Sequence, residues 1–180
     1  MNYSSQLGQD VIVDRILNGK RGGHFVDLGA CWYQNMNNSY FFEKERGWTG
    51  VAVEYDPKFT PGWAEHRPNT KHLLADAMTV DYEKFFIENN LPKMIDYLSI
   101  DLEPPESTLT CLYKVLEAPY EYGVITFEVD YYRNDFVRDE SRTLLRERGY
   151  ILIGEIYDRP GQHIDDVWVH PSIYHDGMKL

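Results

Sequence analysis

Four short apolar runs in the chain each end in a carboxylate. They are His24–Asp27, Gly50–Glu54, Lys93–Asp101 and Gly123–Glu128. Continuous apolar runs of this length are typical of parallel strands that are buried on both faces of a sheet. Because the carboxyl ends of parallel strands meet at one edge, we expect the four acidic side chains to project into one crevice. Open α/β sheets bind their ligands in that crevice.

Segments with helical spacing separate these runs. Apolar residues at positions 7, 11, 12, 16 and 17 predict an amphipathic helix over residues 5–17. Further helices are expected over residues 39–46, 59–67, 80–89, 106–116 and 135–148, and further strands over residues 48–54, 71–75, 94–102, 124–129, 150–156 and 166–170. No helix fits between the last two strands, so they should be antiparallel neighbours. The pattern predicts one domain over residues 1–180, with a doubly wound α/β fold. Its core sheet, over residues 24–170, is seven-stranded and mostly parallel, and its last strand runs backwards.

Charge and composition narrow the choice of ligand. The chain has 29 acidic and 18 basic residues and a formal charge of −11, which disfavours binding to nucleic acid or to an anionic membrane. A neutral or cationic small molecule is the easier ligand. No apolar run approaches the roughly 20 residues of a membrane span, and the first six residues do not resemble a signal peptide. We therefore expect a cytoplasmic protein, with Cys31 and Cys111 reduced.

The loop after the first strand does not match a dinucleotide site. Phe25-Val26-Asp27-Leu28-Gly29-Ala30 supplies a glycine where the strand must turn tightly. A dinucleotide-binding loop needs G-x-G-x-x-G, so that the backbone can approach a pyrophosphate. Here Gly29 is followed by Cys-Trp-Tyr-Gln at positions 31–34, which would crowd a pyrophosphate. A nucleoside ligand without phosphates escapes this objection.

Two acidic residues are candidates for holding such a nucleoside. Glu54 ends the second strand, where a carboxylate can accept hydrogen bonds from both ribose hydroxyls. The alternative is a solvated carboxylate at a strand end. Asp76 follows the third strand, where an adenine amino group would need an acceptor, and Ala77 could contact the ring. Alternatively, Asp76 is the N-cap of a helix.

A second group of carboxylates is expected at the ends of the fourth and fifth strands. Alternation places Asp101 and Glu103 on the same side of one strand end, and Glu128 should stand beside Asp101. Asp101, Glu128 and Asp130 form an all-oxygen set that suits a hard cation such as Mg²⁺ or Mn²⁺. A metal there could bind a substrate hydroxyl and lower its pKa.

The same carboxylates also allow an interpretation without a metal. Asp101 and Glu103 could hold ligand hydroxyls and backbone amides, while Glu128 pairs with Arg133 or Arg138. The sequence is compatible with both interpretations.

One histidine and several aromatic residues are further candidates. His163 lies between the last two strands and could reach the mouth of the crevice as a base. Four aromatic residues flank the strand ends and could stack on a sugar or an aromatic acceptor: Trp32, Tyr33, Tyr131 and Tyr132. Packing is the alternative role for all four.

Several motifs together resemble FkbM-type methyltransferases. They are Ser5–Asp10, Phe25–Ala30, Asn38–Tyr40, Gly47–Val51, Tyr97–Glu103, Val124–Glu128 and Arg148–Tyr150. The resemblance implies a class I fold that binds S-adenosylmethionine and transfers its methyl group to an oxygen. The sequence departs from the family at two places: no second glycine follows Ala30, and Pro104 stands where the family commonly has glycine.

The resemblance also implies roles for individual residues. Asp27, Gly29 and Ala30 would lie on the methionine side of the cofactor, Glu54 at its ribose and Asp76 at its adenine. The full implied cofactor set is Asp27, Gly29, Ala30, Asn38, Glu54, Tyr55, Asp76, Ala77 and Asp101. The implied catalytic residues are Asp101, Glu103 and Glu128, which would remove the acceptor's proton directly or through a metal.

Three functions are compatible with the sequence. The first is an O-methyltransferase acting on a hydroxyl of a sugar or small natural product, with a small-molecule or glycan acceptor. The second is a catalytically silent binding module, which would have no affinity for the cofactor. The third is a metal-dependent sugar-nucleotide enzyme. That enzyme would need basic residues beside the crevice, and few lie near the strand ends.

Overall fold

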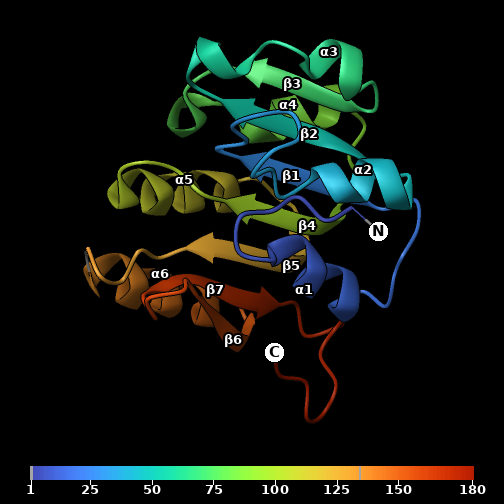
Figure 1. The fold of residues 1–180 in the computed structure, drawn as a ribbon. Helices are drawn as coiled ribbons and strands as arrows, with labels where there is room; N and C mark the ends of the chain where they lie inside the picture. Colours follow the sequence, from blue (N-terminus) through green and yellow to red (C-terminus); the bar gives the residue numbers. More distant parts are fainter. Residues whose placement is uncertain (1, 134) are drawn as a thin grey trace.

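The computed structural model describes residues 2–133 and 135–180, which form one seven-stranded sheet (Figure 1). The strand order is β3-β2-β1-β4-β5-β7-β6. The bounds are β1 His24–Leu28, β2 Thr49–Glu54, β3 Thr70–Leu74, β4 Met94–Ile100, β5 Glu121–Glu128, β6 Ile151–Tyr157 and β7 His163–Val169. The pairs among β1 to β5 are parallel, and β7 runs antiparallel to both β5 and β6. The predicted mostly parallel sheet with a reversed last strand is confirmed.

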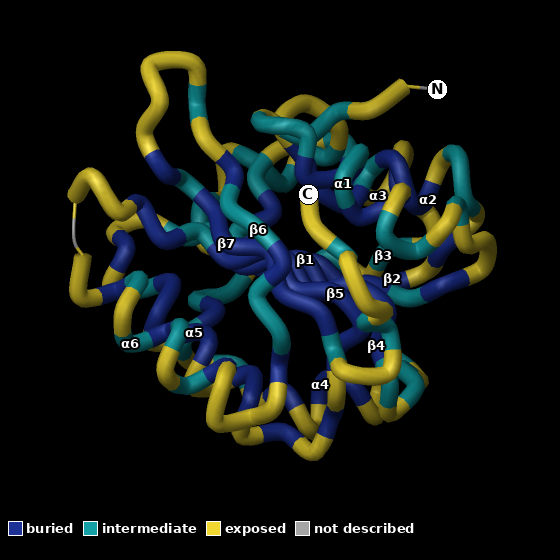
Figure 2. The backbone as a smooth tube through the Cα atoms, turned by 90° about the horizontal axis from the view of Figure 1, so that it is seen from below, coloured by how far each residue is buried: buried dark blue, intermediate teal, exposed yellow. Residues whose placement is uncertain are grey.

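Helices cover both faces of the sheet (Figure 2). One face carries α1 Gln9–Ile16, α2 Tyr40–Arg46 and α3 Trp63–His66, and the other carries α4 Tyr82–Glu88, α5 Pro105–Glu117 and α6 Asp135–Glu147. Two short 3₁₀ helices follow β2 and β3: η1 Pro57–Phe59 and η2 Ala77–Thr79. The central strands are buried on both sides, as their continuous apolar runs require. None of the described helices has the length and apolar character needed to cross a bilayer.

The first helix is shorter than its sequence pattern predicts. It begins at Gln9, not at residue 5, because the preceding segment turns around the buried side chain of Asp10. The Asp10 carboxylate accepts hydrogen bonds from the backbone N–H groups of Ser4 at 2.6 Å and Ser5 at 3.1 Å. Gly8 then adopts a left-handed conformation with φ of 85°. Leu7 keeps its place against the apolar core without being helical.

The fourth strand also ends earlier than predicted, at Ile100. The Asp101 N–H still donates to the Leu28 carbonyl at 3.0 Å, but the backbone of Leu102 turns to Thr108. The Thr108 hydroxyl accepts from the Leu102 N–H at 3.1 Å and donates to its carbonyl at 2.7 Å. The chain therefore leaves the sheet to start α5, and Asp101 and Glu103 do not alternate along one strand as expected.

Candidate functional site

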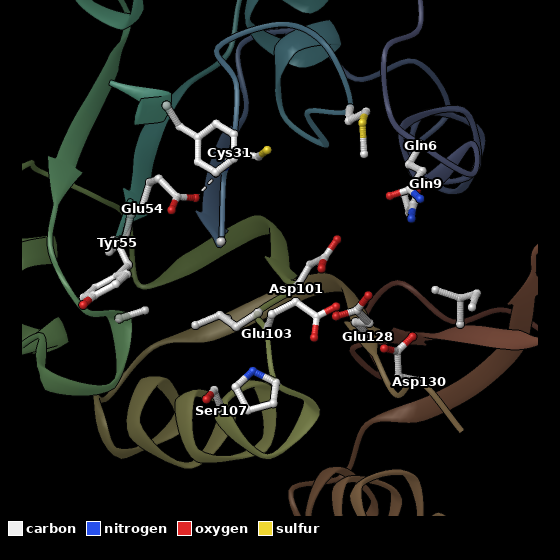
Figure 3. Close-up of a pocket in the computed structure, with 18 of the residues that line it drawn as sticks. Gln6, Gln9, Cys31, Glu54, Tyr55, Asp101, Glu103, Ser107, Glu128 and Asp130 are labelled. Atoms are coloured by element: carbon white, nitrogen blue, oxygen red, sulfur yellow. Dashed lines mark hydrogen bonds between the residues drawn. The ribbon is translucent and has the colours of Figure 1, made fainter. Parts of the chain in front are cut away.

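A cavity of about 910 Å³ opens at the carboxyl ends of the parallel strands. Figure 3 shows Glu54 and Tyr55 at one end of it, Glu128 and Asp130 at the other, and Asp101 between them. The expected convergence of strand-end carboxylates in one crevice is thus confirmed for Glu54, Asp101 and Glu128.

Glu54 is held in a fixed orientation at the end of β2. Its Oε2 accepts a hydrogen bond from the Cys31 N–H, and its Oε1 accepts one from the Asp56 N–H, both at 2.8 Å. Only 9% of the residue is exposed. Each carboxylate oxygen can accept a second hydrogen bond, so Glu54 can receive two hydroxyl donors from a ligand in the cavity. Tyr55, beside it, is 75% exposed and also lines the cavity.

Asp76 is the N-cap of a short helix and also lines the cavity. Its Oδ1 accepts from the Met78 N–H at 2.9 Å, which caps η2. Ala77 and Met78 line the cavity beside it. The cap fixes the carboxylate at the Glu54 end of the cavity, where a ligand amino group could reach it.

Gly29 allows the ends of β1 and β4 to approach each other closely. Its φ is 83°, and a Cβ atom at this position would lie 1.8 Å from the Asp101 carbonyl oxygen. Its N–H donates to the Val53 carbonyl at 3.0 Å. Only glycine satisfies both the left-handed backbone and the close approach. The backbone at this point is therefore exposed to the cavity.

Asp27 does not line the cavity, because alternation along β1 turns its side chain toward α2. Its carboxylate accepts hydrogen bonds from Ser39 Oγ at 2.7 Å and from Asn37 Nδ2 at 3.2 Å. Burial raises the pKa of Asp27 to about 6, although the Ser39 hydrogen bond and the charge of Arg67 oppose this. Through these two hydrogen bonds, Asp27 holds the loop over residues 30–39 in place.

Ala30 and Asn38 likewise support this loop and do not line the cavity. The Ala30 carbonyl accepts from Asn37 Nδ2 at 2.7 Å. Asn38 Nδ2 donates to Ser99 Oγ at 2.9 Å. The contribution of these residues to a ligand site is therefore the shape of the loop that carries Cys31 and Met36, which do line the cavity.

Arg67 holds the same loop in place, a role that was not predicted from the sequence. Its side chain is fully buried, and its Nε donates to Glu43 Oε2 at 2.7 Å. Its Nη1 donates to the Tyr33 carbonyl at 2.9 Å and to Asn37 Oδ1 at 3.0 Å. A lone arginine before a proline carries no sequence signal for such a network.

Asp101 and Glu128 form a carboxyl pair across the ends of β4 and β5. Each carboxyl group is near enough to shift the pKa of the other. Burial, followed by the charge of Asp101, raises the pKa of Glu128 to about 11, and burial also raises the pKa of Asp101. Burial and the neighbouring charge therefore favour retention of a proton by this pair at neutral pH. The predicted neighbourhood of Glu128 and Asp101 is confirmed.

Glu103 and Asp130 line the cavity but are bound to an arginine. Arg133 Nη1 lies 2.5 Å from Glu103 Oε2 and 3.0 Å from Asp130 Oδ2. Glu103 is thus paired with Arg133, so the close pair of Asp101 and Glu103 that the strand alternation predicted is not formed by two unpaired carboxylates. The interpretation without a metal paired Glu128 with Arg133 or Arg138. In the structure, Arg133 pairs with Glu103 and Asp130 instead.

The residues present do not fit a resident cation in the cavity. Among the described residues, the ligand atoms of the predicted set Asp101, Glu128 and Asp130 do not all lie within 4.8 Å of one another, and Asp130 is paired with Arg133. Within residues 2–133 and 135–180, the group whose ligand atoms lie within 4.8 Å of one another is instead Glu155, His163 and Asp166. Arg142 Nη2 already forms ion pairs within that group, at 2.5 Å from Glu155 Oε1 and 2.7 Å from Asp166 Oδ1.

His163 is not at the mouth of the cavity. It is 6% exposed, and its Nε2 lies 2.9 Å from Asp166 Oδ1. The expectation that it reaches the crevice is therefore not met, because it belongs to the ion-pair group around Arg142.

Of the four aromatic residues singled out in the sequence, Tyr132 lines the cavity. The other three are engaged elsewhere: Trp32 packs edge-on against Phe59, Tyr33 stacks on His66, and Tyr131 lies under Arg138.

The opposite wall of the cavity comes from the segment before α1 and from its first turn. Gln6, Leu7 and Gln9 close the cavity near Glu128 and Asp130. Behind them, Asp165 of β7 is 2% exposed and accepts a hydrogen bond from Gln9 Nε2 at 2.8 Å. Sequence reasoning missed this wall, although Ser5–Asp10 stood out as a motif.

We expect Asp165→Asn to stabilise the protein above pH 7. Burial raises the pKa of Asp165 to about 8, whereas its usual value is 3.8. Between these values the unfolded chain gives up this proton and the folded chain keeps it, so the wild type loses stability as the pH rises. The free energy of unfolding of the variant should exceed that of the wild type by about 5 kcal/mol at pH 8, with a small difference at pH 4. Urea unfolding at both pH values measures this. An equal difference at both would contradict the expectation.

The fold and the cavity together define a class of protein. This strand order, with β7 antiparallel to β5 and helices on both faces, matches the Rossmann-like fold of class I methyltransferases. No protein-family model matches the chain, and a search of curated protein sequences finds no significant match.

Solved structures with a similar fold include S-adenosylmethionine-dependent methyltransferases. Aeropyrum pernix fibrillarin with natively bound S-adenosyl-L-methionine is 14% identical, with a TM-score of 0.58 over 92% of this chain and 74% of that chain. A TehB-like methyltransferase from Corynebacterium glutamicum is 13% identical, with a TM-score of 0.55 over 92% and 89%. The Burkholderia thailandensis 1,6-didemethyltoxoflavin-N1-methyltransferase, with S-adenosylhomocysteine bound, is 17% identical, with a TM-score of 0.57 over 90% and 76%. Because the sequence identities are 13% to 17%, these comparisons show that the fold is similar and show nothing about the substrate.

Proposed function

We propose that this protein is an S-adenosylmethionine-dependent O-methyltransferase of the FkbM type, acting on a hydroxyl of a sugar or small natural product. The observation that carries the proposal is one cavity that has the Glu54 and Asp76 carboxylates at one end and the neighbouring carboxyl groups of Asp101 and Glu128 further along. A cytoplasmic location and a small-molecule or glycan acceptor, with neither nucleic acid nor membrane as a partner, are part of the same proposal.

The cavity suits a cationic nucleoside. In the proposed pose, Glu54 accepts from the ribose hydroxyls, and Asp76 accepts from the adenine amino group, beside Ala77. Gly29 and Cys31 border the methionine part, whose sulfonium lies near Asp101. Among the described residues that line the cavity, Lys58 is the one with a positively charged side chain. Its Nζ lies 2.6 Å from Asp56 Oδ2. A diphosphate would find little positive charge here, which disfavours the sugar-nucleotide alternative.

The carboxyl pair can supply the base that O-methylation requires. When bound, S-adenosylmethionine provides a methyl group that its sulfonium makes electrophilic. Asp101 accepts the proton of the acceptor hydroxyl as the O–C bond forms and the S–C bond breaks. Glu128 keeps its own proton and donates a hydrogen bond to Asp101. This hydrogen bond holds the Asp101 carboxylate in place. The raised pKa of Asp101 brings its proton affinity closer to neutral pH, where a base is most effective.

Two experiments test the proposal in sequence. Isothermal titration with S-adenosylmethionine and S-adenosylhomocysteine should detect binding of both. Radiolabelled methyl donor, incubated with a panel of monosaccharides, oligosaccharides and polyhydroxylated natural products, should then label an acceptor. An absence of binding heat for both cofactor forms would favour the silent binding module. Binding without transfer to any hydroxyl compound would contradict O-methylation.

Replacing Glu54 with alanine should weaken cofactor binding. Hydrogen bonds to a charged acceptor contribute about 1.5 to 3 kcal/mol, so Glu54→Ala should raise the Kd for S-adenosylhomocysteine roughly 10- to 100-fold. Isothermal titration measures the change. As a matched control, Glu65→Ala removes a carboxylate from the exposed side of α3 and should leave the Kd within about twofold. An unchanged Kd for Glu54→Ala would show that this residue does not hold the ligand.

A further inference from the structure

Met36 combines an unfavourable backbone conformation with an exposed apolar side chain at the cavity. The described residues other than glycine that have a positive φ are Asn18, Cys31, Met36, Asn90 and Asp130. Asparagine and aspartate adopt this left-handed conformation more readily than other side chains do. The two remaining residues, Cys31 with φ of 52° and Met36 with φ of 56°, lie in one loop and both line the cavity. Strain of this kind persists where the surrounding structure enforces it, and it clusters at ligand sites.

Contacts on both sides of Met36 enforce its backbone conformation. The next residue, Asn37, is 1% exposed, and its Oδ1 accepts from Arg67 Nη1 at 3.0 Å. The Asn37 carbonyl accepts from Ser4 Oγ at 3.1 Å, which connects the loop to the segment before α1. On the other side, the Tyr33 carbonyl accepts from Arg67 Nη1 at 2.9 Å. The loop is therefore held in place by hydrogen bonds in which Met36 takes no part.

The Met36 side chain is 52% exposed, although it lines the cavity. Exposed apolar surface contributes nothing to folding, whereas a ligand that fills the cavity would remove this surface from water and gain affinity. A methionine side chain is flexible and polarisable, so it can adapt its shape to such a ligand.

The position of Met36 in the loop indicates which part of the ligand it would cover. In the proposed pose, the methionine part of the cofactor borders Gly29 and Cys31, and Met36 belongs to the same loop as Cys31. Glu54 and Asp76, which would hold the nucleoside, follow β2 and β3 instead.

We propose that Met36 covers the methionine part of the bound cofactor, and that the loop holds its side chain over the cavity at a cost in backbone strain. This inference rests on the proposed function and adds a binding residue to the site. A contact with the methionine part alone should affect ligands that contain this part and spare those that lack it.

Isothermal titration with S-adenosylhomocysteine and with adenosine tests the inference. Adenosine keeps the ribose and adenine groups that Glu54 and Asp76 would hold, and it lacks the thioether and the amino-acid part. Met36→Ala should raise the Kd for S-adenosylhomocysteine about tenfold and leave the Kd for adenosine within about twofold. Met36→Leu, which keeps an apolar side chain of similar volume, should leave both Kd values within about threefold.

Ile87→Ala is the matched control for loss of an exposed apolar side chain. Ile87 is 59% exposed on α4 and is not among the residues that line the cavity. This variant should leave both Kd values within about twofold of the wild type.

Thermal unfolding without ligand tests the strained backbone. At an ordinary position a glycine variant is less stable than an alanine variant, because glycine makes the unfolded chain more flexible. At a left-handed position, relief of the backbone strain offsets this loss. Met36→Gly should therefore have a Tm at least as high as that of Met36→Ala. A lower Tm for Met36→Gly would overturn the strain part of the inference.

The outcomes of the titrations separate this inference from the proposed function. A loss of affinity in Met36→Ala that is confined to S-adenosylhomocysteine supports the contact. Equal losses for both ligands would show that the loop is disturbed as a whole, and unchanged Kd values would show that Met36 does not contact the cofactor. Either result overturns the inference and leaves the methyltransferase proposal intact. If the wild type does not bind S-adenosylhomocysteine, both fail.

Discussion

Asp101→Asn is expected to lower kcat for methyl transfer by about 100- to 10,000-fold, the usual contribution of a positioned general base. The asparagine side chain has nearly the same shape as aspartate but cannot accept the hydroxyl proton. It also removes the negative charge that faces the sulfonium, so the Kd for S-adenosylmethionine should rise as well. Initial rates with labelled S-adenosylmethionine, at saturating concentrations of the donor and of the acceptor found in the panel, measure kcat apart from binding.

Glu128→Gln is the informative companion to this variant. The raised pKa of Glu128 favours a protonated carboxyl group, which could donate a hydrogen bond to Asp101, and a glutamine amide can take over that role. We therefore expect Glu128→Gln to lower kcat far less than Asp101→Asn, by about tenfold or less. The reverse order of effects would mean that Glu128, and not Asp101, accepts the proton. Equal rates in all three proteins would show that the pair takes no part in catalysis.

Gly29→Ala is expected to destabilise the protein by about 3 kcal/mol and to abolish cofactor binding. The left-handed backbone costs a residue with a side chain about 1 kcal/mol, and the new methyl group would overlap the Asp101 carbonyl oxygen. The end of β4 would have to move away from β1 and carry Asp101 with it. Thermal unfolding should show a fall in Tm of roughly 10 °C. Titration with S-adenosylhomocysteine measures the binding.

Gly149→Ala separates the two causes of this effect. Gly149 has a φ of 85°, close to that of Gly29, but a Cβ atom there would meet no atom within 4 Å. Its cost should therefore be the backbone term alone, about 1 kcal/mol, with cofactor binding unchanged. If both variants lost the same stability, the close approach of β1 and β4 would not be the reason for Gly29.

The elements that the sequence predicts well are the buried strands. Their continuous apolar runs are visible in the sequence because a strand covered on both faces cannot carry polar side chains along its length. The order of these runs also predicts that the carboxylates at their ends meet at one edge of the sheet. The ends of helices and strands were predicted less well where a side chain further along the chain accepts a hydrogen bond from the backbone. Thr108 does this for the Leu102 N–H, and Asp10 does it for the Ser4 N–H.

The roles of individual acidic residues were harder to predict. Asp27 and Glu54 both end buried runs, yet only Glu54 lines the cavity. The difference comes from alternation along the strand together with the loop that Arg67 holds over Asp27, and a single arginine gives no sign of that network. His163 was expected to reach the mouth of the crevice, and its true partners, Asp166 and the Arg142 group, depend on how β6, β7 and α6 pack.

Local spacing along the chain was enough to predict the alternation of strands and helices, the acidic edge of the sheet and the unsuitability of the first loop for a pyrophosphate. These features depend on neighbours in the chain, whose spacing determines which way side chains point. The folded arrangement was needed to show that Asp101 pairs with Glu128, that Arg133 binds Glu103 and Asp130, and that Asp165 and Gln9 stand behind the pair. Those contacts join distant segments, and the protonation they impose depends on burial, which no stretch of sequence specifies alone.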